Sequence, residues 1–217
     1  MPVRVGLKVI ELWNSSMENV VQEYEKEPVE KGKIVFYGPS NFTRWSEKWG
    51  MTPLAEALKG KSGAKCCINR GFGSSGEEHH VYYYHRMVLP LAPKVLVYKP
   101  SGNGGCFGYS TEECFELAQR VVAYTRADFP DTRIYLCSSC RRKEETPENL
   151  AKKREYDSLL KELAENTPNC FYLDLHNYKP FENPDIFVQD GVHFNKEGYD
   201  IFADYFREAL KEELDQF

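Results

Sequence analysis

Short apolar stretches alternate with longer amphipathic stretches along most of the chain. Each apolar stretch has four or five residues, is rich in branched or aromatic side chains, and is bounded by polar or turn-forming residues. This pattern is typical of strands buried on both faces of a parallel sheet. The five predicted strands are Lys33–Tyr37, Lys65–Asn69, Lys94–Tyr98, Arg133–Cys137 and Cys170–Leu173.

The amphipathic stretches predict helices that cover this sheet. They span Thr111–Phe129, Pro147–Asn166 and Lys196–Phe217, and a further helix is expected around His79–His85. Residues 1–30 are interpreted as an added N-terminal helical extension. Strands that alternate with helices predict an α/β fold with helices on both faces of a parallel sheet. With no linker or internal repeat, residues 1–217 are predicted to form a single domain.

Composition narrows the class of protein. Hydrophobic residues make up 41% of the 217 residues, which is enough for a substantial core. The net charge of −5 and the lack of a basic block argue against a nucleic-acid partner. No apolar run approaches a membrane span or the apolar core of a signal peptide, so we expect a soluble, cytoplasmic protein without a membrane partner.

Residues suited to acyl transfer follow the predicted strands. Ser40 follows the first strand, Gly71 the second and Asn103 the third, whereas Asp190 and His193 come just before the last helix. Ligands gather at the carboxyl ends of parallel strands, so these residues are expected to meet there. A serine nucleophile needs a neutral imidazole as base, a carboxylate to orient that imidazole, and donors that stabilise an oxyanion.

Four sequence blocks carry a resemblance to a known family. They are Gly38-Pro39-Ser40-Asn41, Asn69-Arg70-Gly71-Phe72-Gly73, Ser101-Gly102-Asn103-Gly104-Gly105 and Asp190-Gly191-Val192-His193. In order and spacing they resemble the blocks of the SGNH (GDSL-like) hydrolases, from about Lys33 to Gly198. The resemblance implies a three-layer αβα, flavodoxin-like sandwich with a five-stranded parallel sheet in the order 2-1-3-4-5.

The resemblance also implies roles for the residues. Ser40 would be the nucleophile, His193 the base and Asp190 the residue that orients His193. The oxyanion hole would consist of the backbone N–H groups of Ser40 and Gly71 and the side-chain amide of Asn103. The implied activity is that of a serine esterase that forms an acyl-enzyme and needs neither a metal nor a cofactor. The substrate would be a small ester with a short acyl group, such as an acylated carbohydrate, because the chain has little length for a lid.

Two positions depart from the family pattern. Pro39 stands where the family usually has an aspartate or serine, but it leaves the N–H of Ser40 intact. Gly104 and Gly105 follow Asn103, where the family has an acid. The alternative function is therefore a catalytically decayed binding module on the same fold. Taken alone, Ser40 is also compatible with a helix cap, and Asp190-Gly191 with an ordinary turn.

The remaining chemistry-bearing residues have simpler interpretations. Seven cysteines cannot all pair within the chain, and most are expected to be reduced core thiols. Cys137 and Cys140 form a C-x-x-C motif, for which a redox role is the alternative. His79, His80 and His85 lack the i, i+4 spacing of a helical zinc site. Asp174 and His176 are interpreted as structural.

Overall fold

A five-stranded parallel sheet forms the centre of the molecule. The computed structural model describes residues 10–100 and 103–217, with the backbone alone for residues 10–15. The strands are β1 (Ile34–Gly38), β2 (Cys67–Gly71), β3 (Val95–Tyr98), β4 (Arg133–Cys137) and β5 (Cys170–Leu173). Their order is β2-β1-β3-β4-β5, and all neighbouring pairs are parallel. The predicted α/β fold and strand order are confirmed.

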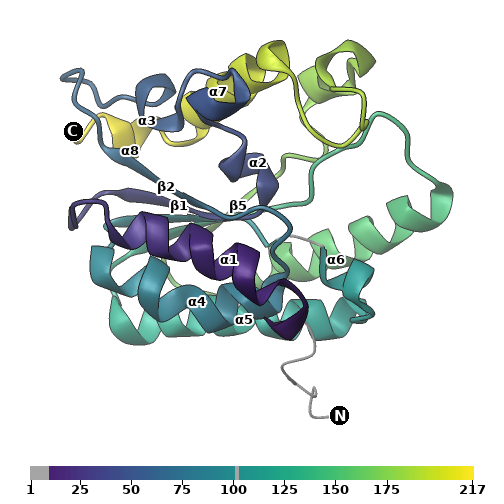
Figure 1. Ribbon diagram of the computed structural model, residues 1–217, viewed down its shortest axis with the longest axis horizontal. Helices are drawn as coiled ribbons and strands as arrows, with labels where there is room; N and C mark the ends of the chain where they lie inside the picture. The colour runs from purple at the N-terminus through teal and green to yellow at the C-terminus, as the bar shows by residue number, and fades with distance from the viewer. Residues whose placement is uncertain (1–9, 101–102) are drawn as a thin grey trace.

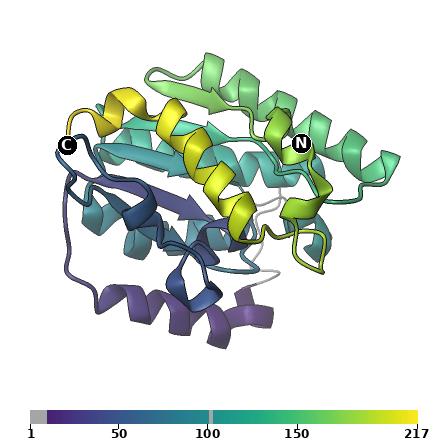
Figure 2. The same cartoon turned by 90° about the horizontal axis from the view of Figure 1, so that it is seen from above.

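Helices cover both faces of the sheet, giving three layers (Figure 1). One face carries α1 (Ile10–Glu25), α4 (Glu77–Met87), α5 (Thr111–Asp128) and α6 (Pro147–Glu165). The other carries α2 (Ser40–Thr43), α3 (Leu54–Ala57), α7 (Lys196–Ala209) and α8 (Lys211–Leu214). Figure 2 shows α7, in yellow, running across this second face. The 3-10 turns are η1 (Glu47–Trp49), η2 (Leu89–Leu91), η3 (Asn103–Phe107), η4 (Lys179–Glu182) and η5 (Pro184–Ile186).

The second face has a core rich in aromatic side chains. Phe36 of β1 packs edge-on against Phe206 of α7, with ring centroids 5.2 Å apart. Phe42 of α2 packs edge-on against the same Phe36 ring at 5.3 Å, and Trp45 lies 5.2 Å from Phe202. Edge-to-face aromatic pairs stabilise a core beyond the area that they bury. These contacts hold α2 and α7 against one face of the sheet.

The helix boundaries agree with most of the sequence predictions. Ser110 caps α5: its hydroxyl accepts the N–H of Glu113, while the Glu113 carboxylate accepts the N–H of Ser110. The predicted helix Lys196–Phe217 is wrong in one respect, because it is divided into α7 and α8 at Leu210. The backbone of Leu210 leaves the helical region (φ −105°, ψ 16°), and its side chain is completely buried. The turn keeps Leu210 and Leu214 in the core of this face.

The N-terminal extension was predicted over residues 1–30. Within it, α1 occupies Ile10–Glu25, and residues 1–9 lie outside the described residues. The same is true of Ser101 and Gly102 in the third sequence block.

The four-residue helices α2 and α3 were not predicted, because one turn is too short to show helical periodicity.

Candidate active site

Ser40 lies directly beyond the carboxyl end of β1. The strand ends at Gly38, Pro39 occupies the N-cap position of α2, and Ser40 is the first residue of that helix. The side chain of Ser40 makes no cap hydrogen bond. Instead its Oγ lies 2.7 Å from Nε2 of His193, so the interpretation of Ser40 as a helix cap is wrong. The N–H of Ser40 has no hydrogen-bond acceptor in the part of the chain that the structure describes.

A tight turn before α7 presents His193 to Ser40. Gly191 has a φ of +66°, which glycine adopts without steric cost. Oδ1 of Asp190 accepts the backbone N–H groups of Val192 and His193, both at 2.9 Å. Its Oδ2 lies 2.7 Å from Nδ1 of His193. The turn and the side-chain contact are therefore parts of one arrangement, in which Asp190 holds both the backbone and the ring of His193.

Electrostatics favour an ionised Asp190 and a neutral His193. Burial acts to raise the pKa of Asp190, but the N–H groups of His193 and Val192 and the imidazole hydrogen bond lower it to about 2. Burial lowers the pKa of His193, the Asp190 hydrogen bond opposes this, and the positive charge of Arg44 reinforces it. At neutral pH the Nδ1–H of His193 then donates to Asp190, which leaves Nε2 to accept from the Ser40 hydroxyl.

Arg44 is a charged neighbour of this arrangement that the sequence analysis missed. Its Nη1 lies 3.3 Å from Oδ2 of Asp190, and its guanidinium lies 4.5 Å from the centre of the Trp49 ring. Stacking on an aromatic face restricts a guanidinium. Arg44 therefore places a fixed positive charge beside the Asp190–His193 pair.

The N–H of Gly71, which was predicted to form part of the oxyanion hole, donates to Oδ1 of Asn69 at 2.8 Å in this structure. Nδ2 of Asn69 donates to the carbonyl of Phe42 in α2 at 2.7 Å. A Cβ added at Gly71 would lie 2.4 Å from the backbone nitrogen of Thr43 and 2.6 Å from the carbonyl carbon of Phe42. Gly71 lets β2 approach the backbone of α2 closely.

Asn103 begins η3 and lines the same pocket as Ser40. Its Nδ2 donates to the backbone carbonyl of Ser75 at 3.0 Å. The hydroxyl of Ser75 is 2.9 Å from Nε2 of His80, whose Nδ1 is 3.2 Å from the hydroxyl of Tyr98. Ser75 and His80 are fully buried, so this second serine–histidine contact is closed to solvent. It supports the loop that anchors Asn103.

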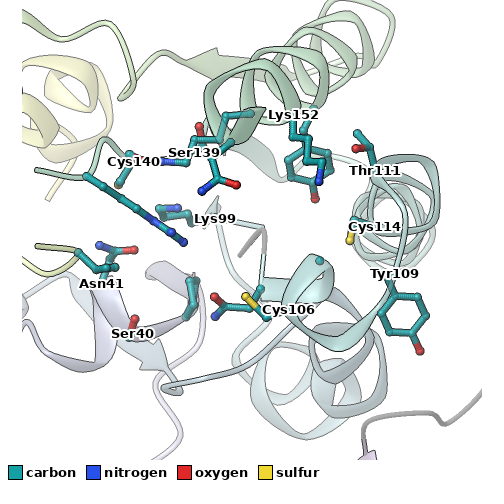
Figure 3. Close-up of a pocket in the computed structure, with 18 of the residues that line it drawn as sticks. Ser40, Asn41, Lys99, Cys106, Tyr109, Thr111, Cys114, Ser139, Cys140 and Lys152 are labelled. Carbon is teal, nitrogen blue, oxygen red and sulfur yellow. Dashed lines mark hydrogen bonds between the residues drawn. The ribbon is translucent and has the colours of Figure 1, made fainter. Parts of the chain in front are cut away.

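The pocket beside Ser40 has a volume of about 610 Å³. It extends past η3 to the start of α5 and to α6, and Figure 3 shows Ser40 at one side of it. Lys99, which directly follows β3, lines the pocket although its side chain is almost completely buried. The sequence analysis missed Lys99, although a lysine that directly follows an apolar strand was the available signal.

The other candidate groups have structural roles. Cys137 and Cys140 are free thiols, and burial raises the pKa of both, which disfavours the reactive thiolate. Asp174 caps the backbone N–H of Asn177, and the backbone N–H of His176 donates to Ser138. Within residues 10–100 and 103–217, no group of three or more potential metal-ligating side chains could hold a metal ion.

No helix in the described part of the chain is long and apolar enough to cross a bilayer.

Comparisons with known proteins identify the fold and the family. A comparison with curated protein sequences gave no significant match. Among solved structures, a candidate acylhydrolase from Bacteroides fragilis is 19% identical, with a TM-score of 0.71 over 92% of this chain and 98% of that one. An acetyl xylan esterase is 21% identical, with a TM-score of 0.66 over 82% and 99% of the two chains. A GDSL-like lipase from Bacteroides thetaiotaomicron is 18% identical, with a TM-score of 0.63 over 95% and 99%.

These structures share the fold. The model of the GDSL-like lipase/acylhydrolase family matches residues 36–201, a stretch that contains Ser40, Asp190 and His193. The match covers most of the chain, and the chain belongs to the GDSL-like lipase/acylhydrolase family.

Proposed function

We propose that the protein hydrolyses carboxylic esters through an acyl-enzyme formed on Ser40. The observation that carries this proposal is the hydrogen-bonded chain from Asp190 through His193 to Ser40, with contacts of 2.7 Å at both steps. It ends at a pocket large enough for a small ester. Membership of a lipase/acylhydrolase family supports the same class of reaction.

The reaction would run in two halves. In the first, Nε2 of His193 takes the hydroxyl proton as Oγ of Ser40 attacks the ester carbonyl, and the alcohol leaves with that proton. In the second, water gives a proton to His193 and attacks the acyl-enzyme, which releases the acid and restores the serine. Asp190 stabilises the imidazolium that forms in each half.

The oxyanion of each tetrahedral intermediate needs hydrogen-bond donors. We assign this role to the N–H of Ser40 and the side-chain amide of Asn103, and not to Gly71, whose N–H donates to Asn69. Pro39 does not disturb this assignment, because it removes only its own N–H.

Short acyl groups are the proposed substrates, and an acylated carbohydrate is one candidate alcohol part. One of the structural neighbours is an acetyl xylan esterase, which is compatible with this choice. Many of the residues that line the pocket beyond Ser40 are polar or charged, which is compatible with a polar alcohol.

The test is hydrolysis of p-nitrophenyl acetate by the wild type and three variants. Ser40→Ala and His193→Ala should each lower kcat by about 10⁴-fold or more, while Asp190→Asn should give a smaller but clear loss. Ser158→Ala, whose hydroxyl donates to the Arg154 carbonyl on α6, is the matched control and should keep full activity. Wild-type protein that hydrolyses no ester would favour the decayed binding module, whereas Ser40→Ala that remains active would contradict the role of Ser40 as the nucleophile.

A further inference from the structure

The pocket beside Ser40 is strongly asymmetric in charge. Among the described residues that line it, one is acidic, Glu112, and five are basic. The basic residues are Lys99, Arg141, Arg142, Lys152 and Lys153. The pocket lining is therefore opposite in sign to the net charge of −5 of the whole chain. Such a lining raises the local concentration of anions.

Three of these cations are neutralised by neighbouring acids. Lys153 is paired with Glu145, and it also donates to the carbonyl of Cys140. Lys152 and Arg141 each form an ion pair with a glutamate on the outer side of the pocket, at 2.8 and 3.0 Å. The paired glutamates offset most of the positive charge of these three residues, so the three residues do not by themselves make an anion site.

Lys99 differs from these three because it is buried and unpaired. Its side chain is 2% exposed, and it makes neither an ion pair nor a hydrogen bond with any described residue. Asp157 is the buried acid that interacts with it electrostatically, but both oxygens of that carboxylate accept hydrogen bonds from Ser139, at 2.7 and 2.6 Å. A buried ammonium without a paired acid is costly for a protein to keep, and it needs polar partners.

Lys99 is also close to the nucleophile in the fold. Its backbone N–H donates to the carbonyl of Tyr37 at 3.0 Å. Next along β1 is Gly38, where an added Cβ would lie 3.1 Å from Cβ of Lys99. Gly38 stands two residues before Ser40, and Figure 3 draws Lys99 in the middle of the pocket, with Ser40 on one side and Ser139 and Cys140 on the other.

We propose that Lys99 forms the floor of an anion-binding subsite and that the enzyme prefers esters carrying a carboxylate near the scissile bond. This inference rests on the proposed function and names its substrate class. Arg142, which also makes no ion pair or hydrogen bond through its side chain with the described residues, adds positive charge at the exposed side of the pocket.

Two matched pairs of esters test the preference and show which part of the substrate carries the anion. p-Nitrophenyl hydrogen succinate against p-nitrophenyl pentanoate places the carboxylate in the acyl part. m-Acetoxybenzoate against m-acetoxybenzamide places it in the alcohol part. Wild-type kcat/KM should be about tenfold or more higher for the anionic member of at least one pair, the size expected for a hydrogen bond to a charged group. Raising the ionic strength should reduce that ratio.

Variants then assign the preference to Lys99. Lys99→Met keeps the length of the side chain without the charge, and it should bring the ratio of anionic to neutral kcat/KM close to one. Lys161→Met is the matched control, because Lys161 lies on α6, is exposed and does not line the pocket. It should leave the ratio unchanged. Thermal unfolding of each variant checks that it is folded. If Lys99→Met does not fold, the wild-type ratio and its dependence on ionic strength still test whether the enzyme prefers anionic esters.

The possible failures are distinguishable. A wild-type ratio near one in both pairs overturns the anionic preference, and an unchanged ratio in folded Lys99→Met overturns its assignment to Lys99. In both cases ester hydrolysis stands. If the wild type hydrolyses none of the four esters, the proposed function fails and this inference fails with it.

Discussion

Replacing Gly71 with alanine should damage catalysis without touching a reacting group. The new Cβ would lie 2.4 Å from the backbone nitrogen of Thr43, whereas ordinary contact begins at 3.4 Å. Either β2 or α2 must therefore move by about 1 Å. The obstacle is backbone on the α2 side, so no side-chain rotation can relieve it.

The displacement matters because α2 begins with Ser40. A shift of about 1 Å would disturb the 2.7 Å contact between Oγ of Ser40 and Nε2 of His193. Misplacement of this size costs about 100-fold in rate, so kcat/KM for p-nitrophenyl acetate should fall by about two orders of magnitude. Overpacking should also lower the free energy of unfolding by about 1–3 kcal/mol, which leaves most single-domain proteins folded.

The assay combines steady-state hydrolysis with urea unfolding of the same preparations. Gly73→Ala is the matched control, because a Cβ there would meet only Oγ1 of Thr43, at 3.9 Å. Gly73→Ala should change kcat/KM by less than about threefold, since a substitution that creates no steric conflict usually has a small effect. Gly71→Ala with wild-type activity and stability would refute the role of Gly71 as the contact that places α2.

Four further predictions concern pH, thiols and stability. Since His193 must be neutral to act as base and its pKa is lowered by burial and Arg44, kcat/KM should rise with pH and be half-maximal below pH 6.5. Arg44→Met removes a positive charge that lowers the pKa of His193, so the pH–rate profile of this variant should move to higher pH. The control Arg120→Met, on α5, should keep the wild-type profile. An Arg44→Met profile that coincides with the wild-type profile would contradict the electrostatic argument. Because burial raises the pKa values of Cys137 and Cys140, native protein should show no change of kcat/KM on adding dithiothreitol, and a large change would indicate a redox role. Thr146→Ala removes the cap of α6 and should lower the free energy of unfolding by about 1 kcal/mol in urea while leaving hydrolysis intact; equal stability would show that the cap contributes nothing.

The strands were predictable because each is buried on both faces and reads as an unbroken apolar run. β1 and β3 are completely buried. The predicted Lys33–Tyr37 is displaced from β1 by one residue, and the predicted Lys94–Tyr98 begins one residue before β3. Their order in the sheet came from the resemblance of the four sequence blocks to a family, since apolar runs carry no information on which strands are neighbours.

The site was predictable in part. The reach of His193 to Ser40 follows from the rule that functional loops gather at the carboxyl ends of parallel strands. The engagement of the Gly71 N–H by Asn69 depends on a side-chain rotamer and on how closely β2 approaches α2, neither of which a linear pattern records. The burial of Lys99 was missed for a similar reason, because it depends on the elements that close the pocket around it.

The most direct test of the account is the site of covalent labelling by a fluorophosphonate. Intact-mass measurement followed by peptide mapping should find one phosphonyl group per chain, attached to Oγ of Ser40, and the adduct should be absent from His193→Ala at the same exposure time. An adduct on a different residue, or an unmodified protein under conditions that label a known serine esterase fully, would contradict the claim that His193 activates Ser40.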